Sequence, residues 1–326
     1  MIIRFQKKHQ VLSTSRNYRE VTNLAKIRKL NLIFVGKHGG SDKFDKLNAS
    51  IDRINKLSKI IKKNKPDIAI SFCSPEASRV AFGLGIKHIS FSDSPHAEAV
   101  MRLSIPFVQK LLIPWIIPKR EFEKFGINKK DIIQYKAIDA ASIARRVIKK
   151  NKFSVNSKRK KTILVRVEED QAAYSNKDSS KTIKIIRSLI KEFSNENILV
   201  LGRYATQIQF INRTFGKRIK ILNKVVDGKE LLSMIDVFVG SGGTMTAEAA
   251  LLGVPTISYN AIPNFIESYL VKKKLVKRVI NPKQIVNSIK KILSSSNVEH
   301  QKRAKLALNS MEDPYSKLLK AIRTSV

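Results

Sequence analysis

The alternation of short apolar runs with longer stretches of helical period is the feature that most constrains the fold of this chain. Ile68 to Ser71 and Ile163 to Val165 have the length and β-branched content of buried strands, and helix-like segments separate such runs. This order predicts an α/β architecture of parallel strands joined by crossover helices. The expected strands are 11–14, 32–35, 68–71, 88–91, 111–113, 132–135, 163–165, 198–201, 219–222, 237–239 and 256–259.

The clearest helix is predicted from Lys43 to Lys63, before Pro66. Its apolar residues recur every three or four positions and share one face, opposite a solvated Lys-rich face. They are Phe44, Leu47, Ile51, Ile54, Leu57 and Ile61. Further helices are expected at 182–193, at 244–252 and in the tail from Pro282.

Two domains are expected, because 326 residues is about twice the usual domain length of roughly 150. The segment from Arg145 to Lys161 is dense in cations and has no apolar period, which predicts a linker. We therefore expect Rossmann-like domains over residues 1–148 and 156–326, joined by a basic linker at 149–155.

The charge is strongly positive, with 63 Lys and Arg against 26 Asp and Glu, a net +37. Such a field attracts phosphates, nucleic acids or anionic lipid, although AT-rich coding equally explains Lys enrichment beside Ile and Asn. The single cysteine, Cys73, excludes an intrachain disulfide and indicates a reducing compartment. No export signal or membrane span is evident, so we expect a cytoplasmic protein.

The segment from Val237 to Tyr259 carries the clearest chemical signal: a strand, a Gly-rich turn, a helix and an exit into another strand. A helix N-terminus behind such a turn favours an anion, so a phosphate is expected there. Glu248, one turn into the helix, is placed to accept hydrogen bonds from a ribose. The alternative is a plain packing turn. The phosphate candidates are Gly240, Ser241, Gly242, Gly243 and Thr244.

Four segments resemble a largely archaeal family of unknown function in the glycosyltransferase-B superfamily: VGKHGG (35–40), SPEASRVAFGLGI (74–86), SDSPHA (92–97) and GSGGTMTAEAALLGVP (240–255). The similarity covers nearly the whole chain. The superfamily includes the non-hydrolysing UDP-N-acetylglucosamine 2-epimerases and the transferase that makes lipid II. The resemblance implies two Rossmann-like domains facing a cleft, with 241–244 on a nucleotide-sugar diphosphate and Glu248 on its ribose.

Other candidates follow predicted strands, where open α/β sheets bind ligands. Arg166 and Arg203 are expected to brace a diphosphate, although in so basic a chain either is equally explained as a surface arginine. Asp93 and His96 are spaced to act as an acid/base pair, and their position resembles that of a cleft carboxylate in the 2-epimerases. His38 is a weaker substrate-binding candidate, since a glycine turn explains its surroundings equally. The scattered histidines predict no metal site.

The function expected is nucleotide-sugar-dependent glycosyl transfer, with a UDP-linked donor as substrate and no separate cofactor. The alternatives are a sugar-nucleotide 2-epimerase and a non-enzymatic basic protein that binds nucleic acid or a lipid surface. Nucleic acid is disfavoured because no recognition motif accompanies the charge. A lipid-linked acceptor would imply weak attachment to an anionic membrane at its inner face. The expected anchors are Ile105, Phe107, Leu111, Leu112, Trp115 and Ile116, beside Lys110, Lys119 and Arg120; the alternative is a buried strand with a Pro-bounded loop.

The first domain is expected to lack the first strand and helix of the family. Only a short segment precedes Val11, fewer than the dozen or so residues that a parallel crossover needs. In a sheet of order 3-2-1-4-5 the first strand is central, so its absence leaves two inner strands without a partner between them.

Overall fold

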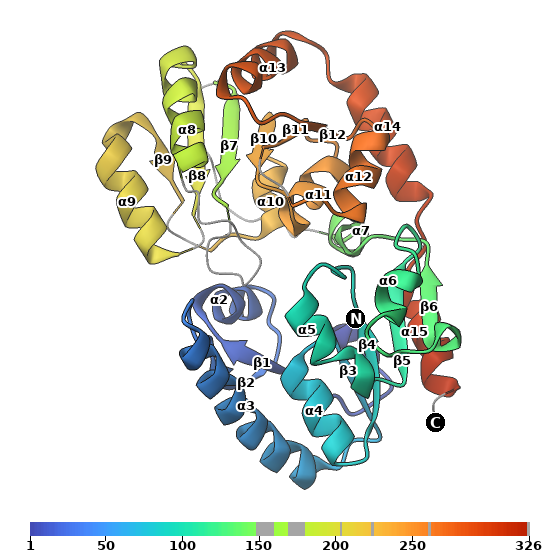
Figure 1. Cartoon of the computed structure of the whole chain (residues 1–326). Coiled ribbons are helices and arrows are strands. Elements are labelled where there is room, and N and C mark those ends of the chain that lie inside the picture. Colours follow the sequence, from blue (N-terminus) through green and yellow to red (C-terminus); the bar gives the residue numbers. More distant parts are fainter. Residues whose placement is uncertain (148–159, 169–179, 203, 223–224, 260–261, 325–326) are drawn as a thin grey trace. The chain divides into compact units, whose positions relative to one another are not determined.

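The computed structural model describes residues 1–147, 160–168, 180–202, 204–222, 225–259 and 262–324, and the chain divides into two compact units (Figure 1). Unit 1 consists of Met1–Ala137 and Glu312–Val326, and unit 2 consists of Ile138–Met311. Each unit is built from parallel strands and helices, so the predicted α/β class is confirmed.

The division differs from the predicted domains, 1–148 and 156–326, in two places. Helix α7 (Asp139–Ala144) belongs to unit 2, where its buried alanines pack against α11 (Thr244–Leu251). Helix α15 (Pro314–Arg323) returns to unit 1, where it packs against β5 (Lys110–Pro114) and β6 (Ile132–Tyr135). The predicted linker at 149–155 lies outside the described residues.

Unit 1 contains two separate parallel sheets. One pairs β1 (Thr14–Asn17) with β2 (Ile33–Lys37), and the other has the order β3-β4-β5-β6, with β3 at Ile68–Ser71 and β4 at Lys87–Phe91. The two sheets are separated between β1 and β3. This is the position of the central strand that the sequence leads us to expect to be missing. An ion pair of 2.5 Å from Arg16 on β1 to Glu76, in the helix after β3, links the two sheets.

The helices of unit 1 cover these sheets and include a short N-terminal turn, α1 (Ile2–Phe5), held against α15. The Phe5 and Tyr315 rings lie 5.1 Å apart, and Arg4 forms an ion pair with Asp313. The other helices of unit 1 are α2 (Arg19–Ile27), α3 (Lys43–Asn64), α4 (Pro75–Gly83), α5 (Glu98–Arg102), η1 (Ile105–Phe107), α6 (Arg120–Glu123) and η2 (Lys129–Asp131).

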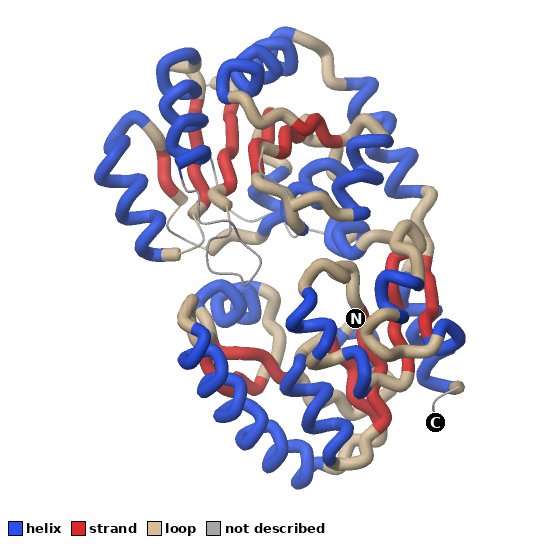
Figure 2. Tube along the Cα trace, in the orientation of Figure 1, coloured by secondary structure: helices blue, strands red, loops and turns tan. Residues whose placement is uncertain are grey.

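Unit 2 is a six-stranded parallel sheet of order β12-β11-β10-β7-β8-β9, with helices on both faces (Figure 2). The strands are β7 (Thr162–Arg166), β8 (Asn197–Leu201), β9 (Lys220–Ile221), β10 (Val237–Gly240), β11 (Thr256–Ser258) and β12 (Val276–Arg278). The remaining helices are α8 (Ser180–Glu192), α9 (Ala205–Phe215), η3 (Gly216–Arg218), α10 (Gly228–Leu232), α12 (Phe265–Lys272), α13 (Pro282–Ser294) and α14 (Val298–Asn309).

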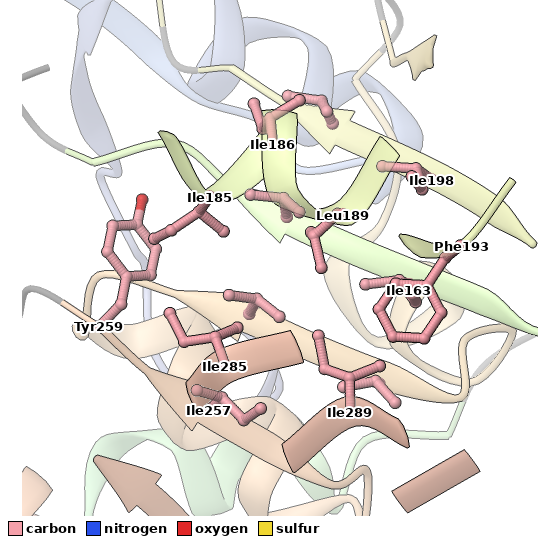
Figure 3. Close-up of a cluster of buried hydrophobic side chains, with 14 of the residues drawn as sticks. Ile163, Ile185, Ile186, Leu189, Phe193, Ile198, Ile257, Tyr259, Ile285 and Ile289 are labelled. Atoms are coloured by element: carbon pink, nitrogen blue, oxygen red, sulfur yellow. The ribbon is translucent and has the colours of Figure 1, made fainter. Parts of the chain in front are cut away.

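A large apolar core holds the sheet of unit 2. Helices α8 and α13 cover one face, and their Ile186 and Ile285 are fully buried against strand residues such as Ile163 and Ile257 (Figure 3). Strand side chains that point to the other face, including Leu164 and others in a second cluster, pack toward α10 and α11. Two buried faces explain why these strands have continuous apolar sequences.

Helix α3 agrees with the predicted bounds, but part of its apolar face is turned outward. Phe44, Leu47 and Ile51 are 69%, 57% and 55% exposed, whereas Arg53 is buried. The buried side of the helix is fixed by polar contacts as well as by Leu57, which packs with Val35 and Val80. The apolar repeat therefore predicted the helix, but it did not predict which side of the helix faces the core.

Three of the six predicted apolar membrane anchors are core residues, so the assignment is wrong for those three. Ile105, Leu111 and Leu112 are 0% exposed, because η1 and β5 lie inside unit 1. Phe107, Trp115 and Ile116 are half-buried, and so are the flanking Lys110 and Lys119, whereas Arg120 is exposed. Within the described residues, no helix combines the length and the apolar character needed to cross a bilayer.

Candidate functional site

The strand order of unit 2 creates a switch point between β7 and β10. From β7 the chain adds β8 and β9 on one side, then crosses to the other side for β10, β11 and β12. Open α/β sheets bind ligands outside the carboxyl ends of the strands at such a point. Arg166 ends β7 and Gly240 ends β10, so the segments that follow both strands lie at this edge.

The loop Ser241–Thr244, named the SGGT loop below, connects β10 to α11 at that edge. Gly242 has φ 93°, and Gly243 has φ 81° and ψ −170°, conformations that essentially only glycine adopts. These two glycines turn the chain so that α11 begins at Thr244 with Gly243 and Thr244 exposed. The N-terminus of α11 therefore faces solvent, as an anion site requires.

Gly240 fits the packing alternative that the sequence left open. A Cβ there would lie 2.5 Å from the Phe238 ring and 3.0 Å from the Thr246 hydroxyl oxygen. Close internal packing therefore accounts for this glycine, whereas backbone conformation accounts for Gly242 and Gly243.

Glu248 lies one turn beyond Thr244 and is only 8% exposed. Its Oε2 lies beside the first residue of α10, since a Cβ on Gly228 would be 3.1 Å from that oxygen. The carboxylate is therefore packed against the start of α10 and largely removed from solvent.

Arg166 lies at the same edge but is already engaged by the backbone. Its Nη1 donates to the carbonyls of Gly202 (2.7 Å) and Leu201 (3.4 Å), which joins the ends of β7 and β8. The guanidinium is half-buried. Its predicted partner in diphosphate binding, Arg203, lies outside the described residues.

A buried polar group beside Arg166 was missed from the sequence. The Tyr259 hydroxyl donates to the Arg166 carbonyl (3.2 Å) and lies 2.8 Å from Thr182 Oγ1, which donates to Glu168 Oε1 (3.1 Å). Glu168 is almost fully buried. Its position two residues after β7 was the available signal, but a strand-end carboxylate has no motif that distinguishes it.

In unit 1, Asp93 and His96 follow the carboxyl end of β4, as predicted. Asp93 is half-buried, and its Oδ1 accepts a hydrogen bond from Ser94 Oγ (2.7 Å). His96 is exposed overall, yet desolvation of its ring lowers its pKa, and the negative charge of Asp93 only partly opposes that shift. The two groups therefore interact electrostatically, and the imidazole is held toward its neutral, proton-accepting form.

His38 stabilises a turn. The backbone N–H of Gly40 donates to His38 Nδ1 (3.1 Å), and a Cβ on Gly39 would lie 2.5 Å from the Asp45 carbonyl oxygen. Tight packing thus explains Gly39, whereas positive φ values of 72° and 68° account for Gly36 and Gly40. Among the residues that the structure describes, no group of three or more His, Cys, Asp and Glu side chains is placed to hold a metal.

The structure thus brings the SGGT loop, Glu248 and Arg166 to one edge of unit 2, while Asp93, His96 and His38 belong to unit 1. The sequence pattern of the family described as "Protein of unknown function (DUF354)" matches residues 1–325. The chain belongs to this family. A relative described as "Uncharacterized protein MJ0665", from Methanocaldococcus jannaschii, is 30% identical over 311 residues, which cover 91% of this chain and 86% of the relative.

Solved structures show the fold. The UDP-GlcNAc 2-epimerase of Neisseria meningitidis, solved bound to UDP-GlcNAc, has a TM-score of 0.74 at 15% identity, covering 99% of this chain and 95% of its own. The spinosyn rhamnosyltransferase SpnG, solved with the spinosyn aglycone, has a TM-score of 0.64 at 9% identity, covering 99% and 94%. This DUF354 chain therefore has the glycosyltransferase-B fold, as the resemblance implied.

Proposed function

We propose that this chain binds a nucleotide sugar and transfers its glycosyl group to an acceptor, with the donor diphosphate at the SGGT loop. The observation that carries the proposal is the Gly242–Gly243 turn, which exposes the N-terminus of α11 at the switch point of the sheet. Helix N–H groups there suit the two negative charges of a diphosphate. A structural neighbour solved with UDP-GlcNAc makes UDP the first nucleotide to test.

In this proposal Glu248 holds the ribose. Its carboxylate accepts hydrogen bonds from the ribose hydroxyls, and its burial beside α10 keeps it in one orientation. Arg166 acts mainly as a brace between β7 and β8, and its guanidinium adds positive charge at the same edge.

Asp93 is the proposed general base, with His96 as its partner. A transferase must remove a proton from the acceptor hydroxyl as the bond to the diphosphate breaks. Asp93 has the required carboxylate at a strand end, and the His96 imidazole is kept neutral enough to accept a proton. No metal or organic cofactor enters the proposal, and we place the reaction in the cytoplasm because the chain has a single cysteine.

Nucleotide titration by calorimetry tests the binding step. UDP should bind, and both Ser241→Ala and Glu248→Gln should weaken it by about tenfold or more, the scale of one lost hydrogen bond to a charged group. Ser233→Ala, an exposed serine of the same unit, is the matched control and should bind normally. No binding of UDP or another nucleoside diphosphate, or equal binding by all variants, refutes the proposal.

C2 epimerisation of the nucleotide sugar is the second candidate. It is suggested by the UDP-GlcNAc 2-epimerase of Neisseria meningitidis, a structural neighbour solved with UDP-GlcNAc. Product analysis separates the two reactions. Sugar transfer that requires an added acceptor supports the transferase, whereas a change at C2 of UDP-GlcNAc without any acceptor supports the epimerase.

A further inference from the structure

Three exposed apolar side chains form a row on one helix of unit 1. Phe44, Leu47 and Ile51, named the apolar stripe below, are 69%, 57% and 55% exposed and lie three and four residues apart on α3. Residues at this spacing share one helix face. No other helix or strand in the described part of the chain carries more than two exposed large apolar side chains.

The outward position of the stripe is fixed by contacts on the opposite side of α3. The Arg53 guanidinium donates to the Val35 carbonyl on β2 and lies 3.9 Å from the buried Glu76. Ser50 Oγ donates to the same carboxylate (3.0 Å). Rotating the helix to bury the stripe would break these contacts and remove two of the groups that hold the buried Glu76 carboxylate, so exposure is the stable arrangement.

The stripe lies on a helix with an excess of lysine. Apart from the buried Arg53, α3 carries six Lys and two Asp, and one of these, Asp52, is paired with Lys56 at 2.8 Å. Lys59, Lys62 and Lys63 extend the exposed positive charge toward the C-terminal end of the helix. A helix with apolar side chains on one face and lysines beside them is typical of helices that lie in a membrane interface.

We propose that α3 docks on an anionic lipid bilayer, with the apolar stripe inserted among the acyl chains and the lysines against the lipid phosphates. Charge complementarity selects this occupant, because a second copy would bring another strongly cationic helix against the first. Area leads to the same choice. Three side chains cover far less than the roughly 1,200 Å² that stable protein interfaces bury, whereas membrane attachment adds electrostatic attraction to a small apolar insertion.

This surface is separate from the buried residues that the sequence suggested as anchors, and the proposal does not depend on the proposed reaction. Nucleotide binding and vesicle binding are measured independently, so failure of either proposal leaves the other open to test.

Co-sedimentation with vesicles tests the docking. The full chain should bind vesicles of phosphatidylglycerol mixed with phosphatidylcholine, bind pure phosphatidylcholine far less, and lose binding as salt is raised. Replacing Phe44 and Leu47 together by Ser should weaken binding by about tenfold or more. The matched control replaces Phe210 and Leu306 by Ser, since these are 56% and 70% exposed on helices of unit 2.

Three results would overturn the proposal. They are no binding of the unaltered chain to anionic vesicles, equal loss in the stripe and control variants, and a dimer that the stripe substitutions convert to a monomer. The last would mean that a second copy covers the stripe. Ile51→Asp is an independent variant in case the double substitution alters folding, and thermal unfolding of each variant checks for that.

Discussion

Replacing Gly243 by alanine should weaken both unit 2 and its anion site. At φ 81° and ψ −170° this residue occupies a region that alanine reaches only with strain of about 1–3 kcal/mol. Nothing lies within 4 Å of the added Cβ, so the cost is conformational and involves no collision. For a unit of this size each kcal/mol lowers Tm by about 2–4 °C, so thermal unfolding should detect the change.

Gly216→Ala provides the control, because Gly216 also has a positive φ, 54°, and open space around its Cβ, but lies at the end of α9. Both variants should lose stability, whereas only Gly243→Ala should weaken UDP binding in calorimetry, by about tenfold or more. An unchanged Tm for Gly243→Ala would refute the argument about strain. Loss of Tm with normal UDP binding would refute the placement of the diphosphate.

Three further outcomes are expected. Desolvation lowers the pKa of His88, which is buried in β4, from 6.5 to about 4. The free energy of unfolding should therefore be unaffected by this residue above pH 6.5 and fall by about 1.4 kcal/mol per pH unit as the pH drops from 6.5 toward 4. Urea unfolding should show a smaller slope in His88→Gln. Burial tends to raise the pKa of Glu76, but Arg16 and hydrogen bonds lower it overall. Glu76→Gln should therefore cost about 3–5 kcal/mol at pH 7, because it removes the buried negative charge that faces Arg16 and Arg53, and a smaller loss in chemical unfolding would contradict this. Asp93→Asn should slow turnover by about 100-fold while UDP affinity is nearly unchanged, and parallel loss of both would instead make Asp93 a binding residue.

Local sequence patterns predicted most of the strands because two buried faces demand uninterrupted apolar residues. Ile163–Val165 and Val237–Val239 are examples, and both lie in strands near the predicted bounds. Strand β12 was missed, since Lys277 and Arg278 are exposed and only Val276 is buried. Strand β1 starts at Thr14 and not at Val11, because its half-exposed residues give little alternation.

The candidate site was predictable where conformation depends on residue type. Gly242 and Gly243 were recognisable because a turn of this kind requires glycine, and Glu248 followed from helix geometry. The burial of Arg53 was not predictable, because its partners Val35 and Glu76 come from two other elements. The contacts of Arg53 place the apolar stripe on the outside, whereas the apolar period alone predicts that the stripe faces the core.

The place of α15 makes the folding of this chain depend on the order of synthesis. Leu318 and Ala321 are fully buried in unit 1, yet the ribosome delivers them after all of unit 2. The Glu312 backbone N–H, which donates to the Lys136 carbonyl (2.8 Å), likewise arrives late. A nascent chain stopped at residue 311 would therefore contain all of unit 2, but its unit 1 would lack the helix that packs against β5 and β6. Chaperones would encounter the chain in this incomplete form.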